Sequence, residues 1–147
     1  MGHRANLIIQ LDEKTISPVV YVHWFDEDRY VKEMSKFFQE AKKCGVIEEN
    51  DIDEYLIGPW IKTIVDTYCY NMINVAVQPW HWENGVTLEE LHTIDDKYGS
   101  KYDAGVILID LQNRKILTTR SDYDYSEILN YSTKEKEHDS ALWDDSY

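Results

Sequence analysis

The spacing of apolar residues changes from about two to about 3.6 near Trp24, and this change constrains the fold more than any other feature of the sequence. Before it, "RANLIIQL" (4–11) and "ISPVVYVHW" (16–24) are short, β-leaning runs separated by a polar turn. Two such runs predict an N-terminal hairpin, with Pro18 at the start or edge of its second strand.

A helix is predicted directly after this hairpin. Asp26 is a good N-cap residue, and Phe25 before it is placed to pack on Tyr30 as a hydrophobic staple. Gly45 is placed to end the helix. One apolar stripe at helical spacing follows the staple, made of Tyr30, Met34, Phe37, Phe38 and Ala41. The stretch "YVHWFDEDRY" (21–30) is therefore predicted to be the end of a strand and the first turn of a helix.

Helical and strand patterns alternate through the rest of the chain. A helical region from 51 to 70 is interrupted at Pro59, which fits best as the first residue of a new helical segment. "MINVAV" (72–77) predicts a buried strand. Residues 104–119, "AGVILIDLQNRKILTT", predict a second hairpin with its turn near Gln112 and Asn113.

A third, shorter helix is predicted between this strand and the second hairpin. Thr87 and Glu90 have the spacing of a capping box, and Gly99 is placed to end the helix. The predicted order is therefore ββααβαββ. This order indicates an α+β fold, a two-layer sandwich of one mostly antiparallel sheet with helices on one face. We expect one domain over 1–120, followed by an acidic, aromatic C-terminal segment over 121–147.

Net charge excludes some partners. The 147 residues carry 28 acidic and 15 basic side chains, which gives −13 at pH 7. Phosphate backbones and anionic lipids would repel such a chain, so direct binding to nucleic acid or membrane is not expected. Apolar runs are too short for a membrane span and no signal-peptide pattern is seen, which favours a cytoplasmic protein. Cys44 and Cys69 are expected to be reduced thiols.

Two groups of residues are candidates for binding a partner. The loop "PWHWEN" (79–84) carries Trp80 and Trp82, which would either anchor an interface or cover the edge of the core. The C-terminal segment contains eight acidic and two basic side chains. Its candidate binding residues are Asp122, Asp124, Trp143, Asp144 and Asp145.

A different candidate site lies at the end of the first hairpin. Arg4 on the first strand is expected near Tyr21 and near Asp26 or Asp28, and His23 would complete a polar site. His23 and Trp24 are neighbours on a strand and are expected on opposite faces. The favoured interpretation of the same residues is a structural hydrogen-bond cluster that joins strand to helix.

Motifs for catalysis and for cofactors are absent from the sequence. There is no G-x-S-x-G elbow and no glycine-rich phosphate loop. His81, Glu83, His92 and His23 do not have the spacing of a metal site. We therefore expect a protein that is not an enzyme and holds neither a cofactor nor a metal.

The segments "MGHRANLII" and "VYVHW", with "GVILID" later in the chain, resemble a set of small phage, plasmid and mobile-element proteins. Those proteins open with Met-Gly-Asn-Arg-Ala and continue to a Tyr-Leu-His-Trp segment. His3 replaces their asparagine, and "FDED" replaces their glycine-rich turn. The family has no established activity, so the resemblance implies genomic context: a small accessory protein that binds a host macromolecule, including host defence machinery. The residues of the match are Gly2, Arg4, Ala5, Tyr21, His23 and Trp24.

Two functions follow as hypotheses. The first is a non-enzymatic accessory protein in a bacterial host cell, which inhibits or redirects a host protein with a basic surface. Its acidic and aromatic surface would imitate nucleic acid if that host protein handles nucleic acid. The second is a protein that binds or sequesters a small, nucleotide-like ligand near Arg4 and His23. A homodimer is a further expectation, because terminal hairpins leave sheet edges to cover.

Overall fold

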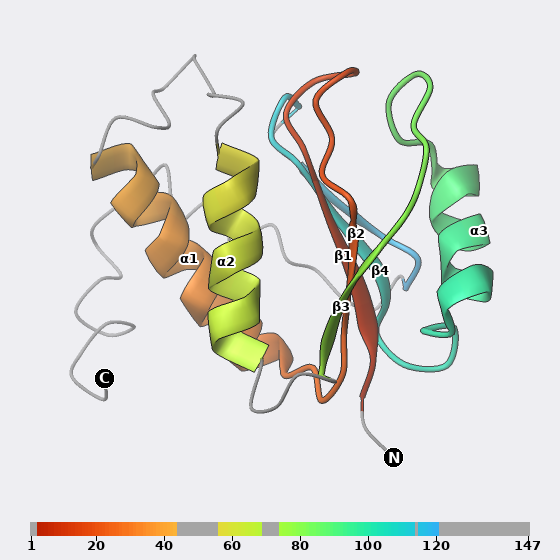
Figure 1. Ribbon diagram of the computed structural model, residues 1–147, viewed down its shortest axis with the longest axis horizontal. Helices are drawn as coiled ribbons and strands as arrows, with labels where there is room; N and C mark the ends of the chain where they lie inside the picture. The colour runs from red at the N-terminus through yellow and green to blue at the C-terminus, as the bar shows by residue number, and fades with distance from the viewer. Residues whose placement is uncertain (1–2, 44–55, 69–73, 114, 121–147) are drawn as a thin grey trace.

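The computed structural model describes residues 3–43, 56–68, 74–113 and 115–120. Within these residues five strands form one open sheet, with the order β3-β2-β1-β4-β5 (Figure 1). The central strand β1 is parallel to its neighbour β4, and the other three neighbouring pairs are antiparallel. The α+β class is confirmed, with a mixed sheet. The strands are β1 (Ala5–Gln10), β2 (Val19–Val22), β3 (Val75–Gln78), β4 (Gly105–Asp110) and β5 (Lys115–Thr118).

The helices of the described residues are α1 (Glu27–Lys43), α2 (Ile57–Tyr68) and α3 (Leu88–Tyr98). Figure 1 shows α1 and α2 side by side on one face of the sheet and α3 on the opposite face. The prediction that the helices share one face is therefore wrong. Its physical reason lies in β1 and β4, which are buried along their whole length and so present apolar side chains to both faces.

Each face of the sheet has its own core. Leu7 and Ile9 of β1 point toward α1 and α2, and the intervening Ile8 points toward α3. The larger core also holds the bulkiest buried side chains of the helices, among them Tyr30, Phe38, Trp60 and Tyr68. The smaller core consists of Ile8, Val19, Leu91, Ile94, Val106 and Leu108.

The local signals at the start of α1 are confirmed. The Asp26 carboxylate accepts hydrogen bonds from the backbone N–H groups of Asp28 (3.1 Å) and Arg29 (3.2 Å). The Phe25 and Tyr30 rings are in contact, with centroids 5.2 Å apart. Asp26 is therefore an N-cap beside a hydrophobic staple.

The signals around α3 and the first hairpin are also confirmed. Thr87 and Glu90 form both bonds of a capping box, and Gly99 takes the left-handed conformation that ends α3. β1 and β2 form the N-terminal hairpin, with Pro18 just before β2. β4 and β5 form the second hairpin.

Two details differ from the sequence prediction. α2 begins at Ile57, so Pro59 is its third residue rather than its first. A proline is tolerated there because N–H groups of the first helical turn have no partner within the helix. The sequence predicts a buried β3, but among the described residues β3 is an edge strand that pairs with β2 alone, and Val77 is 53% exposed.

Several sequence predictions fall on residues outside the described ranges. These are the helix end at Gly45, the thiols of Cys44 and Cys69, and the segment 121–147 with its candidate binding residues. No helix within the described ranges has the length and apolar character needed to cross a membrane.

Candidate functional site

Trp24 has the most unusual conformation among the described residues. It is the only one of them other than glycine with a positive φ, at 62°, and its side chain is 55% exposed. Its indole stacks on the imidazole of His23, with centroids 5.2 Å apart and 14° between the ring planes. The expectation that these side chains point to opposite faces is wrong, because β2 ends at Val22 and the left-handed backbone turns Trp24 back over His23.

The Tyr21 ring on β2 lies next to His23, tilted by 51° to the imidazole plane. Its ring centroid lies 6.2 Å from that of His23. We call Tyr21, His23 and Trp24 together the Trp24 surface. Backbone hydrogen bonds hold it on both sides, from the His23 N–H to the Asn74 carbonyl (2.8 Å) and from the Phe25 N–H to the His3 carbonyl (2.6 Å).

Arg4 lies beside the Trp24 surface, and its ion-pair partner is Asp103. The hydrogen bond to Asp103 raises the pKa of Arg4. Burial raises the pKa of Tyr21, and the Arg4 charge counteracts only part of this rise. The expected proximity of Arg4 and Tyr21 is therefore present. No local pattern points to Asp103, which is 99 positions from Arg4.

Asp26 is not part of this site. Its carboxylate is used by the backbone of α1, as described above. Of the four residues predicted for a ligand site, the structure brings together Arg4, Tyr21 and His23, and replaces the acidic member with Asp103.

A buried polar network connects to the Asp103 loop from the inside. The side chain of Asp95, 3% exposed, forms an ion pair with Arg120 (3.0 Å) and accepts a hydrogen bond from the Ser100 hydroxyl (2.8 Å). Asn6 donates to the same hydroxyl (2.7 Å). Arg120 also donates to the backbone carbonyls of Ser100 (3.1 Å) and Asp103 (3.2 Å). The network joins β1, α3 and the end of β5, and so fixes the loop that carries Asp103.

Trp80 and Trp82 are half-buried and pack against the smaller core under α3. The Trp82 indole donates to the Ser17 carbonyl (3.2 Å), and the Trp80 indole donates to the Glu90 carboxylate (3.4 Å). Their rings also contact each other, with centroids 5.9 Å apart. These contacts match the alternative in which both residues cover the core edge, and their role in partner binding stays a prediction.

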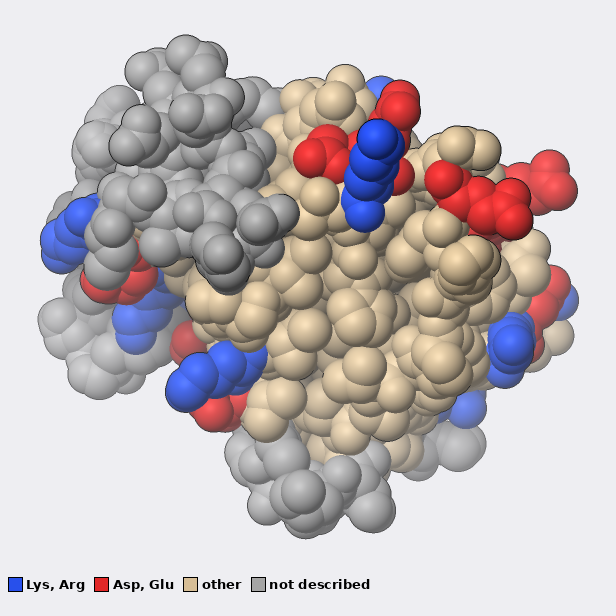
Figure 2. All heavy atoms as spheres, turned by 45° about the horizontal axis from the view of Figure 1, so that its top comes forward, with Lys and Arg blue, Asp and Glu red and all other residues tan. Residues whose placement is uncertain are grey.

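Figure 2 shows several acidic side chains close together on one face of the molecule, with a basic side chain among them. The β1–β2 turn and the loop before α3 meet, since the Gly85 N–H donates to the Glu13 carbonyl (3.1 Å). The exposed acids of these two segments are Asp12, Glu13 and Glu83, and Glu89 follows in the first turn of α3.

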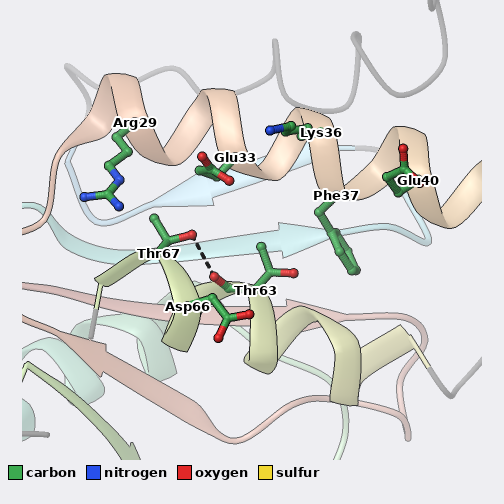
Figure 3. A pocket seen from close by; sticks show the side chains of 8 residues that line it. All are labelled: Arg29, Glu33, Lys36, Phe37, Glu40, Thr63, Asp66 and Thr67. Carbon is green, nitrogen blue, oxygen red and sulfur yellow. Dashed lines mark hydrogen bonds between the residues drawn. The ribbon is translucent and has the colours of Figure 1, made fainter. Parts of the chain in front are cut away.

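A groove of about 330 Å³ lies between α1 and α2 (Figure 3). It was not predicted from the sequence. Its lining mixes charges of both signs, and Asp66 is paired with Lys62 outside the lining (2.5 Å). Side chains of mixed sign give the groove no clear preference for an anion or a cation. The lining residues are Arg29, Glu33, Lys36, Phe37, Glu40, Thr63, Asp66 and Thr67.

No group of three or more His, Cys, Asp or Glu side chains within the described ranges is arranged to hold a metal ion. No protein-family model matches the chain, and searches of curated proteins and of solved structures also find no match. The Trp24 surface presents one exposed indole and two half-buried rings beside an arginine that is paired with Asp103.

Proposed function

We propose that this protein is a non-enzymatic binding protein, and that the Trp24 surface is its contact site for another protein. In keeping with the resemblance noted above, the partner is a host protein in a bacterial cell, and the protein acts by covering a functional surface of that partner. The observation that carries the proposal is the exposed, left-handed Trp24.

The backbone conformation of Trp24 costs free energy, and contacts of its side chain within the domain offset little of that cost. A positive φ costs a residue with a Cβ roughly 1–2 kcal/mol, and glycine or asparagine avoids most of that cost. Strained residues of this kind cluster at functional sites. An indole that remains more than half exposed recovers little of the cost by burial, so its contribution is expected when a partner covers it.

Tryptophan is also well suited to this role. It is enriched among the residues that dominate binding energy, usually at the centre of an interface. Stacking on His23 restricts the indole before binding, which reduces the entropy lost when a partner packs on it. The charge of −13 favours a basic partner, since opposite charge speeds association.

A capture experiment from bacterial host lysate tests this proposal. The full chain is compared with Trp24→Ala and with Leu88→Ala, a control in which an equally exposed apolar side chain (54%) is removed at the start of α3. Loss of a central tryptophan should weaken binding about 30-fold or more. The Leu88→Ala variant should bind as the wild type does, and added salt should weaken binding in both. Equal capture by Trp24→Ala would refute the proposal.

A small, nucleotide-like ligand at Arg4 and His23 is the weaker alternative. Stacked rings next to a guanidinium suit a base and a phosphate. However, Asp103 already neutralises Arg4, and the chain as a whole is strongly acidic. An anionic ligand would therefore have to compete with the Asp103 carboxylate for the guanidinium.

A further inference from the structure

We propose that β3 is a dimerisation edge, at which two copies of this chain pair their β3 strands antiparallel about Ala76. The two five-stranded sheets would then form one continuous sheet. This inference does not rest on the proposed function, because it uses a different surface and a different readout.

The hydrogen-bond pattern of the sheet determines which backbone groups of β3 point outward. The His23 N–H donates to the Asn74 carbonyl, so these two residues form a hydrogen-bonded antiparallel pair. Such pairs alternate with non-hydrogen-bonded pairs along two strands. In the register of β2 and β3, the next hydrogen-bonded pair is Tyr21 with Ala76. The N–H and C=O groups of Val75 and Val77 therefore point away from β2, toward the side of β3 on which the described residues place no further strand.

A two-fold axis at Ala76 uses all of these outward groups. Val75 of one copy then lies opposite Val77 of the second copy, and each such pair exchanges two hydrogen bonds. Two pairs give four hydrogen bonds. Ala76 meets its own copy at the axis as a non-hydrogen-bonded pair, where side chains approach most closely and a small one fits.

The same register covers exposed apolar surface. Val75 packs against the larger core, while Val77 is 53% exposed at the edge. Cross-strand neighbours on one face have Cβ atoms about 5 Å apart. Val77 of each copy would therefore pack on Val75 of the other.

Charge explains why a second copy is the expected occupant. Each chain carries −13, so two copies can approach only where charge is low. β3 has the sequence VAVQ, without a charged residue or a proline to protect it as an edge. The other edge strand, β5, begins with Lys115 and is followed by Arg120. An uncharged, self-complementary strand is suited to isologous pairing.

Sedimentation equilibrium of the full chain tests the proposal. The mass should rise from 17.4 kDa toward twice that value as the concentration increases from roughly 5 to 500 μM. Added salt should favour the dimer, because it screens the repulsion between two acidic chains. This salt response is opposite in sign to that expected for a basic partner at the Trp24 surface. Failure of the dimer proposal can therefore be distinguished from failure of the proposed function.

Three variants complete the test. Val77→Pro removes an outward N–H without touching the bonds between β2 and β3. Val77→Lys places a charged side chain against Val75 of the other copy and brings two lysines into diagonal positions across the new strand pair. Both variants should remain monomeric, while the isosteric Val77→Thr should dimerise as the wild type does. If Val77→Pro does not melt cooperatively, and so does not fold, the oligomeric state of the folded Val77→Lys variant tests the proposal instead. A monomer at every concentration and salt level, or a dimer that persists in the folded lysine variant, would overturn the proposal.

Discussion

The indole of Trp24 lies almost flat on the imidazole of His23, the residue directly before it in the chain. Consecutive residues of a strand cannot stack in this way, because their side chains point to opposite faces. The contact depends on the left-handed backbone at Trp24, and it leaves the indole more than half exposed. A costly backbone conformation thus holds an aromatic side chain in solvent.

The Arg4–Asp103 pair should make stability depend on acid. Burial raises the pKa of Asp103, but the Arg4 hydrogen bond and charge lower it by more, so it lies below the ordinary value of 3.8. The carboxylate therefore contributes stability above that value and loses it as the pH falls through the folded-state pKa. The pair is partly exposed, so we expect less than about 1 kcal/mol.

Urea unfolding at about pH 6 and about pH 3 measures this contribution. Asp103→Asn should lose less stability than the wild type between the two pH values. Arg4→Gln should behave in the same way, because it removes the other member of the pair. An acid dependence that is the same in all three proteins would show that the pair does not contribute.

Gly105 should not tolerate a side chain. Its φ is +74°, and a Cβ built there would lie 2.2 Å from the Thr119 hydroxyl and 3.1 Å from the Arg120 guanidinium carbon. Gly99 has nearly the same φ (+75°) but open space around it, so Gly99→Ala isolates the backbone cost of about 1 kcal/mol. Gly105→Ala should lose about 3 kcal/mol or more, measured by denaturant unfolding. Equal losses for the two variants would mean that the contact with Thr119 is relieved without cost.

Asp95 and Arg120 should act as one unit. Asp95→Asn leaves Arg120 without its buried countercharge, and we expect a loss of about 3 kcal/mol in the free energy of unfolding. Arg120→Met alone should also destabilise. The double variant should cost clearly less than the sum of the two single changes, since both remove the same interaction. Additive losses would contradict this coupling.

Ser35 offers a stabilising change. Its hydroxyl is fully buried within α1 and has no hydrogen-bond partner among the described residues. Ser35→Ala removes this unpaired group and raises helix propensity, so stability should increase by up to about 1 kcal/mol. Ser17 is the matched control, because its buried hydroxyl accepts from the Ile9 N–H (3.0 Å) and donates to the Pro18 carbonyl (2.9 Å). Ser17→Ala should destabilise, and a loss of stability in Ser35→Ala would show that its hydroxyl has a favourable interaction.

Local sequence signals predicted much of the fold. The Asp26 cap, the Thr87–Glu90 box and both hairpins depend on residues close together in the chain, and all are present. The parallel pairing of β1 with β4 depends on packing between distant segments, and the sequence did not reveal it. The exposure of β3 and the position of α3 follow from that pairing.

The candidate site was predictable only in part. Arg4, Tyr21 and His23 are close because one hairpin joins them. Asp103 lies in the loop after α3, and a hydrogen-bond network around Arg120 holds that loop in place. No local sequence pattern indicates this network. The conformation of Trp24 could not be predicted either, because tryptophan has no preference for positive φ. Its stacking on His23 can be explained only from the folded backbone.

The free energy of unfolding of Trp24→Asn tests the central claim most directly. Asparagine tolerates the left-handed conformation, so the variant keeps the backbone and removes both the strain and the indole. If Trp24 is retained for binding, the variant should be as stable as the wild type or up to about 1 kcal/mol more stable. A loss of more than about 1.5 kcal/mol would mean that the indole stabilises the fold, and would contradict the account.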